Sequence, residues 1–314
     1  MKFQIETEIP NPDFKIDYQD KLFLIGSCFS DNIGNKLSQL KFNVTQNPSG
    51  ILFNPMSIAN TLNHICSNLT FNEELLIEQD GLWYSFLHHG SIYSSSKEEL
   101  LSKIENTHAL CHNVLKNTTK LFITFGSAHI YTHKNLKTVV SNCHKVPNTY
   151  FTKSLLTVSE IVENFKKCIS AIKSINPGIK IIFTVSPVLY IKDGIHENQL
   201  SKATLLLAIN ELQKLENIGY FPSYEIVRDE LRDYRFYKED LAHPNDIAIK
   251  YVWEKFSDCY FSDETKEIAF EVEKIIQMEN HKQLQPESDA SKKFTGSLEK
   301  KKRELFDKFP FLNK

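Results

Sequence analysis

The chain has 314 residues, of which 41% are hydrophobic and 24% are charged, and its formal net charge is −2. This composition is typical of a folded globular protein, and the small net charge gives no electrostatic reason to expect binding to nucleic acid or to an anionic membrane surface. No stretch approaches the roughly 18–20 apolar residues of a membrane span, and residues 1–11 lack the apolar run of a signal peptide. We therefore expect a cytoplasmic protein with no nucleic-acid partner and no membrane partner.

Six cysteines are scattered along the chain, and none belongs to a C-x-x-C pair. In a reducing compartment they are expected to be free thiols, most of them small buried side chains. A zinc site needs ligands that are grouped more closely. The sequence therefore predicts no metal and no cofactor. Only Cys28 stands out, because of the segment around it.

The first predicted element is a buried strand over residues 22–25, where four consecutive apolar residues are typical of a central parallel strand. Gly26 ends the strand, and the small side chains of Ser27 and Cys28 follow. Open α/β sheets bind ligands at the carboxyl ends of their strands, so this turn is a candidate ligand site.

A helix is predicted directly after this turn, with Ser30 or Asp31 as its N-cap and its end near Leu40. The N-terminus of a helix presents unpaired N–H groups and the positive end of the helix dipole. Both features stabilise an anion such as a thiolate. The strand, the turn and the helix N-terminus together are therefore an arrangement that can serve as a reactive site.

Further strands and helices alternate along the chain. Strands are predicted at residues 42–44, 121–125, 179–185 and 220–227, and helices at residues 56–66 (with Ser57 as N-cap), 97–115, 159–175, 199–215 and 247–256. Residues 83–93 are rich in aromatic side chains, which indicates an irregular strand pair or a lid over the site. The alternation predicts an α/β fold, a three-layer αβα sandwich with a parallel central sheet.

A change of composition near residue 263 predicts two parts, an α/β domain over residues 1–262 and a C-terminal helical appendage over residues 263–314. Within the appendage, helices are predicted at residues 264–280 and 298–306, with a polar linker at residues 283–291. We expect the appendage to pack on the core or on a second subunit. Its lysine-rich run at residues 300–303 is typical of a solvated helix face rather than of a nucleic-acid site.

Three motifs that can carry chemistry are expected at strand ends or in a late loop: Gly26-Ser27-Cys28, Gly126-Ser127 and Asp240-x-x-His243. In this combination the chain resembles the GSCFA family, which is named after a glycine-serine-cysteine-phenylalanine motif that stands here at residues 26–29. The chain has Ser30 where the family name has alanine. The resemblance runs from Phe23 to about Phe261, with further similar segments at residues 47–57, 142–147, 193–202 and 220–240.

The GSCFA family looks like a branch of the SGNH, or GDSL-type, hydrolases. The resemblance implies a flavodoxin-like sandwich and a hydrolase or acyltransferase that acts on an acyl ester, with an O-acetylated carbohydrate as one candidate substrate. It also implies that His243 is the general base and that Asp240 orients it. An Asp and a His three residues apart in one loop can place the carboxylate beside a ring nitrogen, which fixes the tautomer and the charge of the imidazole.

The nucleophile has two candidates, Cys28 and Ser27. Alignment of the superfamily's Gly-Asp-Ser-Leu motif with residues 26–29 places Cys28 in the position of the nucleophile. A thiol at a helix N-terminus near His243 ionises more readily than a hydroxyl, and a thiolate is the better nucleophile. We therefore favour Cys28, and in that case Ser27 is expected to fix the turn by a local hydrogen bond.

The oxyanion hole is a second point, after the nucleophile, at which the chain departs from the family's relatives. They carry an asparagine in a Gly-x-Asn-Asp block, and Ala128 occupies that position here. Loss of such a donor typically costs about 2.7–4 kcal/mol of transition-state stabilisation. Other groups must replace it if the protein is a hydrolase. The candidates for oxyanion or substrate binding are Gly50, Gly126, Asn54, Asn142 and His144.

A different class of function remains open at this point. The missing asparagine also fits a non-catalytic module that keeps the SGNH fold and binds a small ligand. In that case Cys28 is an ordinary core residue, and His243 is a residue at a helix start that hydrogen-bonds to Asp240. The sequence predicts neither the identity of the substrate nor the oligomeric state.

Overall fold

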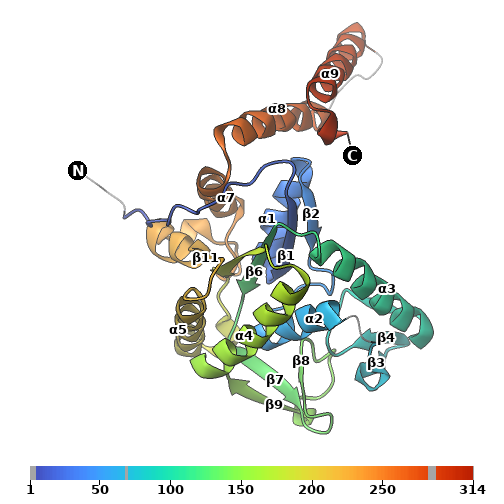
Figure 1. Ribbon diagram of the computed structural model, residues 1–314, viewed down its shortest axis with the longest axis vertical. Coiled ribbons are helices and arrows are strands. Elements are labelled where there is room, and N and C mark those ends of the chain that lie inside the picture. Colours follow the sequence, from blue (N-terminus) through green and yellow to red (C-terminus); the bar gives the residue numbers. More distant parts are fainter. Residues whose placement is uncertain (1–4, 68–69, 282–287, 314) are drawn as a thin grey trace.

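The computed structural model describes residues 5–67, 70–281 and 288–313. Its centre is a five-stranded sheet in the order β11-β10-β6-β1-β2, and every neighbouring pair is parallel (Figure 1). The strands are β1 (Lys21–Gly26), β2 (Asn43–Gln46), β6 (Lys120–Phe125), β10 (Lys180–Val185) and β11 (Ile218–Phe221). The chain first moves from β1 to β2 on one side and then returns to β6 on the other side of β1. The order therefore reverses between β1 and β6, as in a flavodoxin-like sandwich, and this confirms the predicted fold class.

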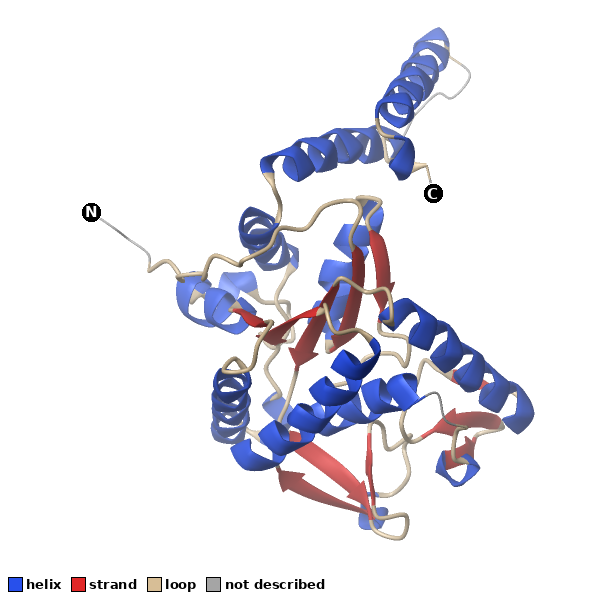
Figure 2. Cartoon of the chain, in the orientation of Figure 1, coloured by secondary structure: helices blue, strands red, loops and turns tan. Residues whose placement is uncertain are grey.

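Helices cover both faces of the sheet (Figure 2). One face, which includes Phe23, Ile123 and Phe183, packs against α2 (Pro55–Ser67), α4 (Val158–Ile175) and α5 (Ile195–Leu212), and α3 (Lys97–Leu115) contacts α2. The other face, which includes Leu22 and Phe122, packs against α1 (Cys28–Gln39) and α7 (Asp246–Tyr260). Burial of both faces explains why β1 is a continuous apolar run rather than an alternating one.

Several helices begin earlier than the sequence indicates, such as α5 at Ile195 instead of residue 199, and α1 and α2 show the cause. The N-cap of α1 is Ser27, whose Oγ accepts a hydrogen bond from the N–H of Phe29 at 3.4 Å, so Ser30 and Asp31 lie inside the first turn. Helix α2 begins at Pro55, and the side-chain oxygen of Asn54 accepts a hydrogen bond from the N–H of Ser57 at 2.8 Å. The residue before the helix therefore caps it in both cases, and the predicted caps Ser30, Asp31 and Ser57 are wrong.

The strand predicted at residues 220–227 ends at Phe221, because Pro222 follows and has no N–H to donate to a sheet. The chain then forms a short helical turn, α6 (Ser223–Glu225), and a π-helical segment, Ile226–Leu231. The Ser223 hydroxyl lies within 2.7 Å of Val185 O, which fixes this turn beside β10.

Along the chain, segments that form two small antiparallel sheets are inserted between the parallel strands. The aromatic stretch at residues 83–93 takes part in the first, formed by β3 (Leu76–Gln79), β4 (Leu82–Ser85) and β5 (Tyr93–Ser94). The second was not predicted and has the order β8-β7-β9, from β7 (His129–His133), β8 (Thr138–Val140) and β9 (Phe151–Leu155). It lies beyond the carboxyl ends of the parallel strands (Figure 2). Short 3₁₀ helices lie at Glu73–Leu75, Asn148–Tyr150, Ile191–Asp193, Tyr234–Phe236 and Pro310–Leu312.

The C-terminal part consists of α8 (Asp263–Glu279) and α9 (Asp289–Lys308), which lie at the end of the molecule opposite to β7 and β9 (Figure 1). Helix α9 is much longer than the predicted 298–306 and includes residues 289–291 of the predicted linker, whereas linker residues 283–287 lie outside the described residues. Helix α8 contributes Ile268 and Val272 to the same apolar cluster as Ile16 and Phe42. Within the described part of the chain, no helix combines the length and the apolar character needed to cross a membrane.

Candidate active site

A cavity of about 720 Å³ opens where β1, β6 and β10 end. Its wall includes residues that lie two or three positions beyond these strands: Cys28 after β1, Ser127 after β6 and Val188 after β10. Since β1 and β6 flank the point at which the strand order reverses, the cavity lies where α/β sheets of this type bind ligands.

The structure separates the two candidate nucleophiles. Cys28 is the first residue of α1 and lines the cavity, half-buried. Ser27 is fully buried and does not line the cavity, and its hydroxyl oxygen is engaged with the N–H of Phe29. Gly26 makes this turn possible: it has a φ of +133°, and a Cβ at this position would overlap the carbonyl oxygen of Thr124 on β6.

The surroundings of Cys28 exert opposing electrostatic effects. Burial, followed by the negative charge of Asp31, raises the pKa of the Cys28 thiol, while the positive charges of Lys202 and Lys238 lower it. The net effect is a raised pKa, so the thiol is protonated in the resting site at neutral pH. A base is therefore needed before Cys28 can act as a nucleophile.

Asp240 and His243 form the hydrogen-bonded pair that the sequence predicts. His243 Nδ1 donates to Asp240 Oδ2 at 2.6 Å, and Asp240 Oδ1 accepts from the N–H groups of Ala242 and His243 at 3.0 Å each. The hydrogen bonds from the N–H groups of His243 and Ala242 and from the His243 ring lower the pKa of Asp240 to about 2. Both side chains line the cavity, and the bond at Nδ1 leaves Nε2 of His243 available for proton transfer.

Two asparagines, Asn54 and Asn142, line the same cavity. Asn54 is 6% exposed, and the bond from Ser57 N–H to its Oδ1 fixes its orientation. Asn142 Oδ1 likewise accepts from the N–H of His144 at 2.9 Å. Neither Nδ2 group has a hydrogen-bond partner among the described residues, so both amides can donate to a bound molecule.

Besides Ser27, three of the residues predicted for oxyanion or substrate binding lie outside the cavity lining. The N–H of Gly50 donates to Asn47 O at 2.8 Å, and the N–H of Gly126 donates to Phe53 O at 2.7 Å. The ring of His144 hydrogen-bonds to Ser85 O at 2.7 Å and stacks on Tyr84. Because these donors are already engaged within the protein, the structure does not bring them to a substrate.

Sequence analysis missed several residues of the cavity wall. His129 lies between two carboxylates, with Nδ1 3.6 Å from Asp193 and Nε2 3.6 Å from Glu197. Tyr190 reaches across to Gly126, where a Cβ would overlap its hydroxyl group. The position of His129, two residues after Ser127 at the end of a predicted strand, was a usable signal. Nothing comparable in the sequence marks Tyr190.

A metal site is not evident in the described part of the chain, which has no group of three His, Cys, Asp or Glu side chains that could hold an ion. All six cysteines are free.

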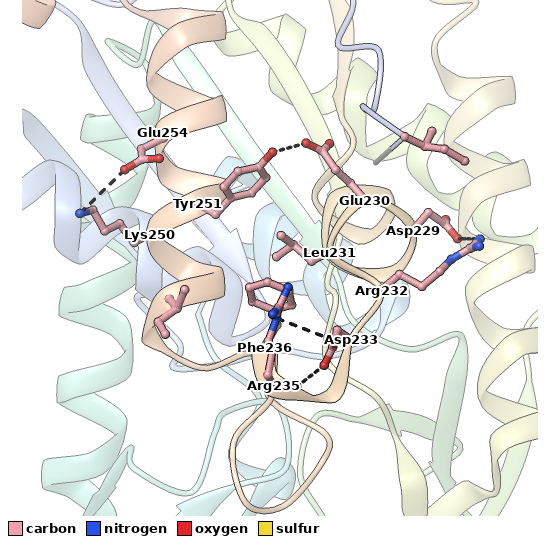
Figure 3. Close-up of a pocket in the computed structure, with 12 residues that line it drawn as sticks. Asp229, Glu230, Leu231, Arg232, Asp233, Arg235, Phe236, Lys250, Tyr251 and Glu254 are labelled. Atoms are coloured by element: carbon pink, nitrogen blue, oxygen red, sulfur yellow. Dashed lines mark hydrogen bonds and ion pairs between the residues drawn. The ribbon is translucent and has the colours of Figure 1, made fainter. Parts of the chain in front are cut away.

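A second pocket, of about 660 Å³, lies between the π-helical segment and α7 (Figure 3). Its charged side chains pair with one another: Arg232 with Asp229 at 3.4 Å, Arg235 with Asp233 at 3.8 Å and Lys250 with Glu254 at 3.9 Å. The Tyr251 hydroxyl hydrogen-bonds to Glu230. The pocket contains none of the predicted site residues, and these polar groups form ion pairs and hydrogen bonds with one another.

Comparison with known proteins gives one family match. A model of the GSCFA family matches residues 21–256, whereas no curated protein matches the chain.

Solved structures with partial similarity include a carbohydrate esterase of family 3 from Talaromyces cellulolyticus, at 8% identity and a TM-score of 0.38, with 76% of this chain and 95% of that chain covered. A family 3 carbohydrate esterase from Clostridium thermocellum has 11% identity and a TM-score of 0.37, with 80% and 98% covered. An acetyl xylan esterase from Butyrivibrio proteoclasticus has 11% identity and a TM-score of 0.39, with 77% and 63% covered. TM-scores this low support no argument about function.

Proposed function

Because the chain belongs to the GSCFA family, we propose that it is an esterase-type hydrolase or acyltransferase that acts on an acyl ester, with Cys28 as the nucleophile. One observation carries the proposal: Cys28, His243 and Asp240 line the same cavity, and the last two form a hydrogen-bonded pair. A nucleophile, a base and a group that orients the base are the parts that acyl transfer requires.

The proposed reaction begins with transfer of the Cys28 proton to His243 Nε2. The thiolate then attacks the ester carbonyl carbon, and the C–O bond to the alcohol breaks as His243 returns the proton to the leaving oxygen. The product is a thioester on Cys28. Water, activated by His243, releases the acid in hydrolysis, and a second hydroxyl compound in place of water gives acyl transfer.

Asn54 is proposed as the replacement for the missing oxyanion asparagine. Its Nδ2 has no partner among the described residues, and its Oδ1 is held by the start of α2. A donor that is fixed in advance stabilises the developing oxyanion without reorganisation during the reaction. Asn142 is proposed as a second donor or as a substrate-binding group.

The proposed substrate is a small-molecule ester, with an O-acetylated carbohydrate as one candidate. The cavity volume is in the range of small-molecule sites. Apolar side chains such as Phe53 and Leu189 and polar ones such as His129 and Asp193 share its wall. A cytoplasmic location also remains a prediction.

The proposal is tested with p-nitrophenyl acetate. Cys28→Ala and His243→Ala are each expected to lower kcat by at least about 10³-fold, because each removes a member of one catalytic unit. Ser27→Ala is the matched control: it removes the adjacent hydroxyl and the helix cap, so it is expected to lower stability by about 1 kcal/mol and to keep the activity. Wild-type turnover in both Cys28→Ala and His243→Ala would refute the proposal.

The second candidate function is a non-catalytic module that binds a small ligand. The raised pKa of Cys28 favours it, because a protonated thiol is a poor nucleophile. Alkylation by iodoacetamide separates the two functions. Selective and pH-dependent labelling of Cys28, above the background of the other five cysteines, supports the enzyme, and labelling no faster than that background supports the binding module.

A further inference from the structure

Lys202 is a buried lysine directly behind the proposed active site. It belongs to α5 and is 1% exposed, on the buried helix face that also carries Ser201, Leu205 and Ile209. Among the described residues no carboxylate pairs with it. Its Nζ instead donates to the carbonyl oxygens of Gly126 at 2.6 Å and of Ser186 at 2.7 Å.

These two carbonyl groups belong to the residues that directly follow β6 and β10. Lys202 therefore links the ends of two strands, and Ser127 and Val188, which lie next along the chain, line the cavity. A cation buried without a counter-charge is costly, and burial lowers the pKa of Lys202 to about 7. A neutral donor could form the same two hydrogen bonds to carbonyl oxygens. A purely structural role therefore does not explain why a lysine occupies this position.

The charge of Lys202 is coupled to Cys28. Its Nζ lies 5.1 Å from the ring centroid of Tyr190, and Tyr190 and Cys28 both line the cavity. A charged Lys202 lowers the pKa of the Cys28 thiol, and an ionised Cys28 raises the pKa of Lys202. Each group thus favours the charged form of the other.

We propose that Lys202 is a positioning residue for Cys28: its buried ammonium group stabilises the Cys28 thiolate, while its two hydrogen bonds hold the strand ends behind the cavity. The role in catalysis rests on the proposed function, whereas the coupling between the two side chains can be measured without it.

Other charges also act on Cys28. Asp31, one turn further along α1, opposes ionisation of the thiol, and its carboxylate accepts a hydrogen bond from Asn47 Nδ2 at 2.6 Å. Lys238 favours ionisation but is exposed, so solvent and salt weaken its effect. Tyr190 and the pair Asp240 and His243 face the same cavity. Lys202 is the fully buried cation of this group, and its effect is the least screened.

The test is the pH dependence of Cys28 alkylation by iodoacetamide, followed by mass spectrometry of the peptide that contains Cys28. Below about pH 7 Lys202 carries its charge, and there Lys202→Met is expected to make alkylation of Cys28 about tenfold slower. Lys202→Arg keeps the charge and is expected to restore most of the rate. Lys120→Met, which removes a largely buried lysine at the opposite end of β6, is the matched control and is expected to leave this rate unchanged. A folded Lys202→Met protein that is alkylated at the wild-type rate below pH 7 would overturn the proposal.

A second measurement applies if Lys202→Met does not fold. The ¹³Cε signal of Lys202, assigned with Lys202→Arg, is titrated in the wild type and in Cys28→Asp. A carboxylate at residue 28 is charged while Lys202 titrates, so Lys202 is expected to deprotonate at a higher pH in Cys28→Asp, and identical titrations would contradict the proposal. Turnover separates the two claims. If Cys28→Ala keeps full activity while Lys202→Met still slows the alkylation of Cys28, the proposed function has failed and the coupling between the two side chains stands.

Discussion

Asn54 divides two tasks between the two ends of its side-chain amide. Its oxygen caps α2, its nitrogen has no partner among the described residues, and the residue lines the cavity. Residue-level analysis of the sequence named Asn54 as one of five possible donors. It had no means of choosing among them, because the choice depends on which N–H groups are already used within the protein, as those of Gly50 and Gly126 are.

Asn54→Asp separates these two tasks. Aspartate keeps an oxygen for the N–H of Ser57 but removes the amide donor and adds a negative charge next to the developing oxyanion. We expect kcat/KM for p-nitrophenyl acetate to fall by about 10²–10³-fold with a Tm close to that of the wild type. Asn54→Ala, which lacks both ends, is expected to lose activity and in addition about 1 kcal/mol of stability. Activity of Asn54→Asp within about twofold of the wild type would exclude Asn54 as the donor.

Lys202 shows another limit of sequence analysis at the scale of single residues. It lies on the buried face of α5 together with Ser201 and Leu205, and a lysine within an apolar helical stripe is a detectable signal. The sequence does not reveal what such a lysine contacts, because its two acceptors lie 76 and 16 residues away along the chain.

At the scale of elements, three histidines lie together where α2 and α3 meet the turn after β4. The ring centroids of His88 and His108 are 5.6 Å apart, and those of His64 and His108 are 6.0 Å apart. Both ring nitrogens of His108 lack a hydrogen-bond partner within the described residues. Burial, reinforced by the neighbouring histidines, lowers the pKa of His88 to about 3 and that of His108 to about 4.

This cluster predicts that the protein loses stability in acid. In the unfolded chain these histidines take up protons below about pH 6.5, whereas the folded protein binds them only near pH 3–4. The unfolded state therefore binds more protons between these limits, and the free energy of unfolding falls as the pH decreases through them. His108→Phe is expected to reduce the loss between pH 7.5 and pH 5 by roughly 2 kcal/mol, measured by urea unfolding at both pH values. An equal loss in the variant and the wild type would contradict this origin.

The elements themselves were predicted unevenly, for a physical reason. The helix over residues 97–115 was predicted with its observed bounds, and the central strands were found because burial on both faces produces continuous apolar runs. The sheet of β7, β8 and β9 was missed. Its strands have three to five residues and mixed exposure, and they are held by pairing with one another rather than by an apolar pattern.

At the scale of the whole molecule, the C-terminal helices lie at the end opposite to β7 and β9 (Figure 1), and β7 carries His129 and Tyr131 of the cavity wall. The match to the family model ends at residue 256, before α8 begins. Helix α8 nevertheless supplies Ile268, Val272 and Ile275 to the apolar cluster that contains Tyr18 and Phe42. The predicted domain boundary at residue 262 remains a prediction, and the contacts of α8 show that residues 263–314 do not stand free of the core.

A chain that ends at residue 262 tests this arrangement. It loses the apolar contacts of α8, so its Tm is expected to fall by several degrees. Its kcat/KM at 20 °C is expected to stay within about twofold of the full chain, because the removed residues are distant from the cavity. A large loss of activity in a protein that is still folded would show that the appendage acts on the site.

The small sheet of β7, β8 and β9 also bears on how such a protein can diversify. Residues 129–143 contribute six residues to the cavity wall, among them Tyr131, Val140 and Asn142, whereas Cys28, His243 and Asp240 come from other parts of the chain. Under the proposed function, this part of the wall is therefore encoded separately from the reacting groups. Exchange or redesign of this one excursion between β6 and α4 would alter which esters fit the cavity, while the reacting groups keep their scaffold. The excursion is thus the natural place at which to engineer a new selectivity.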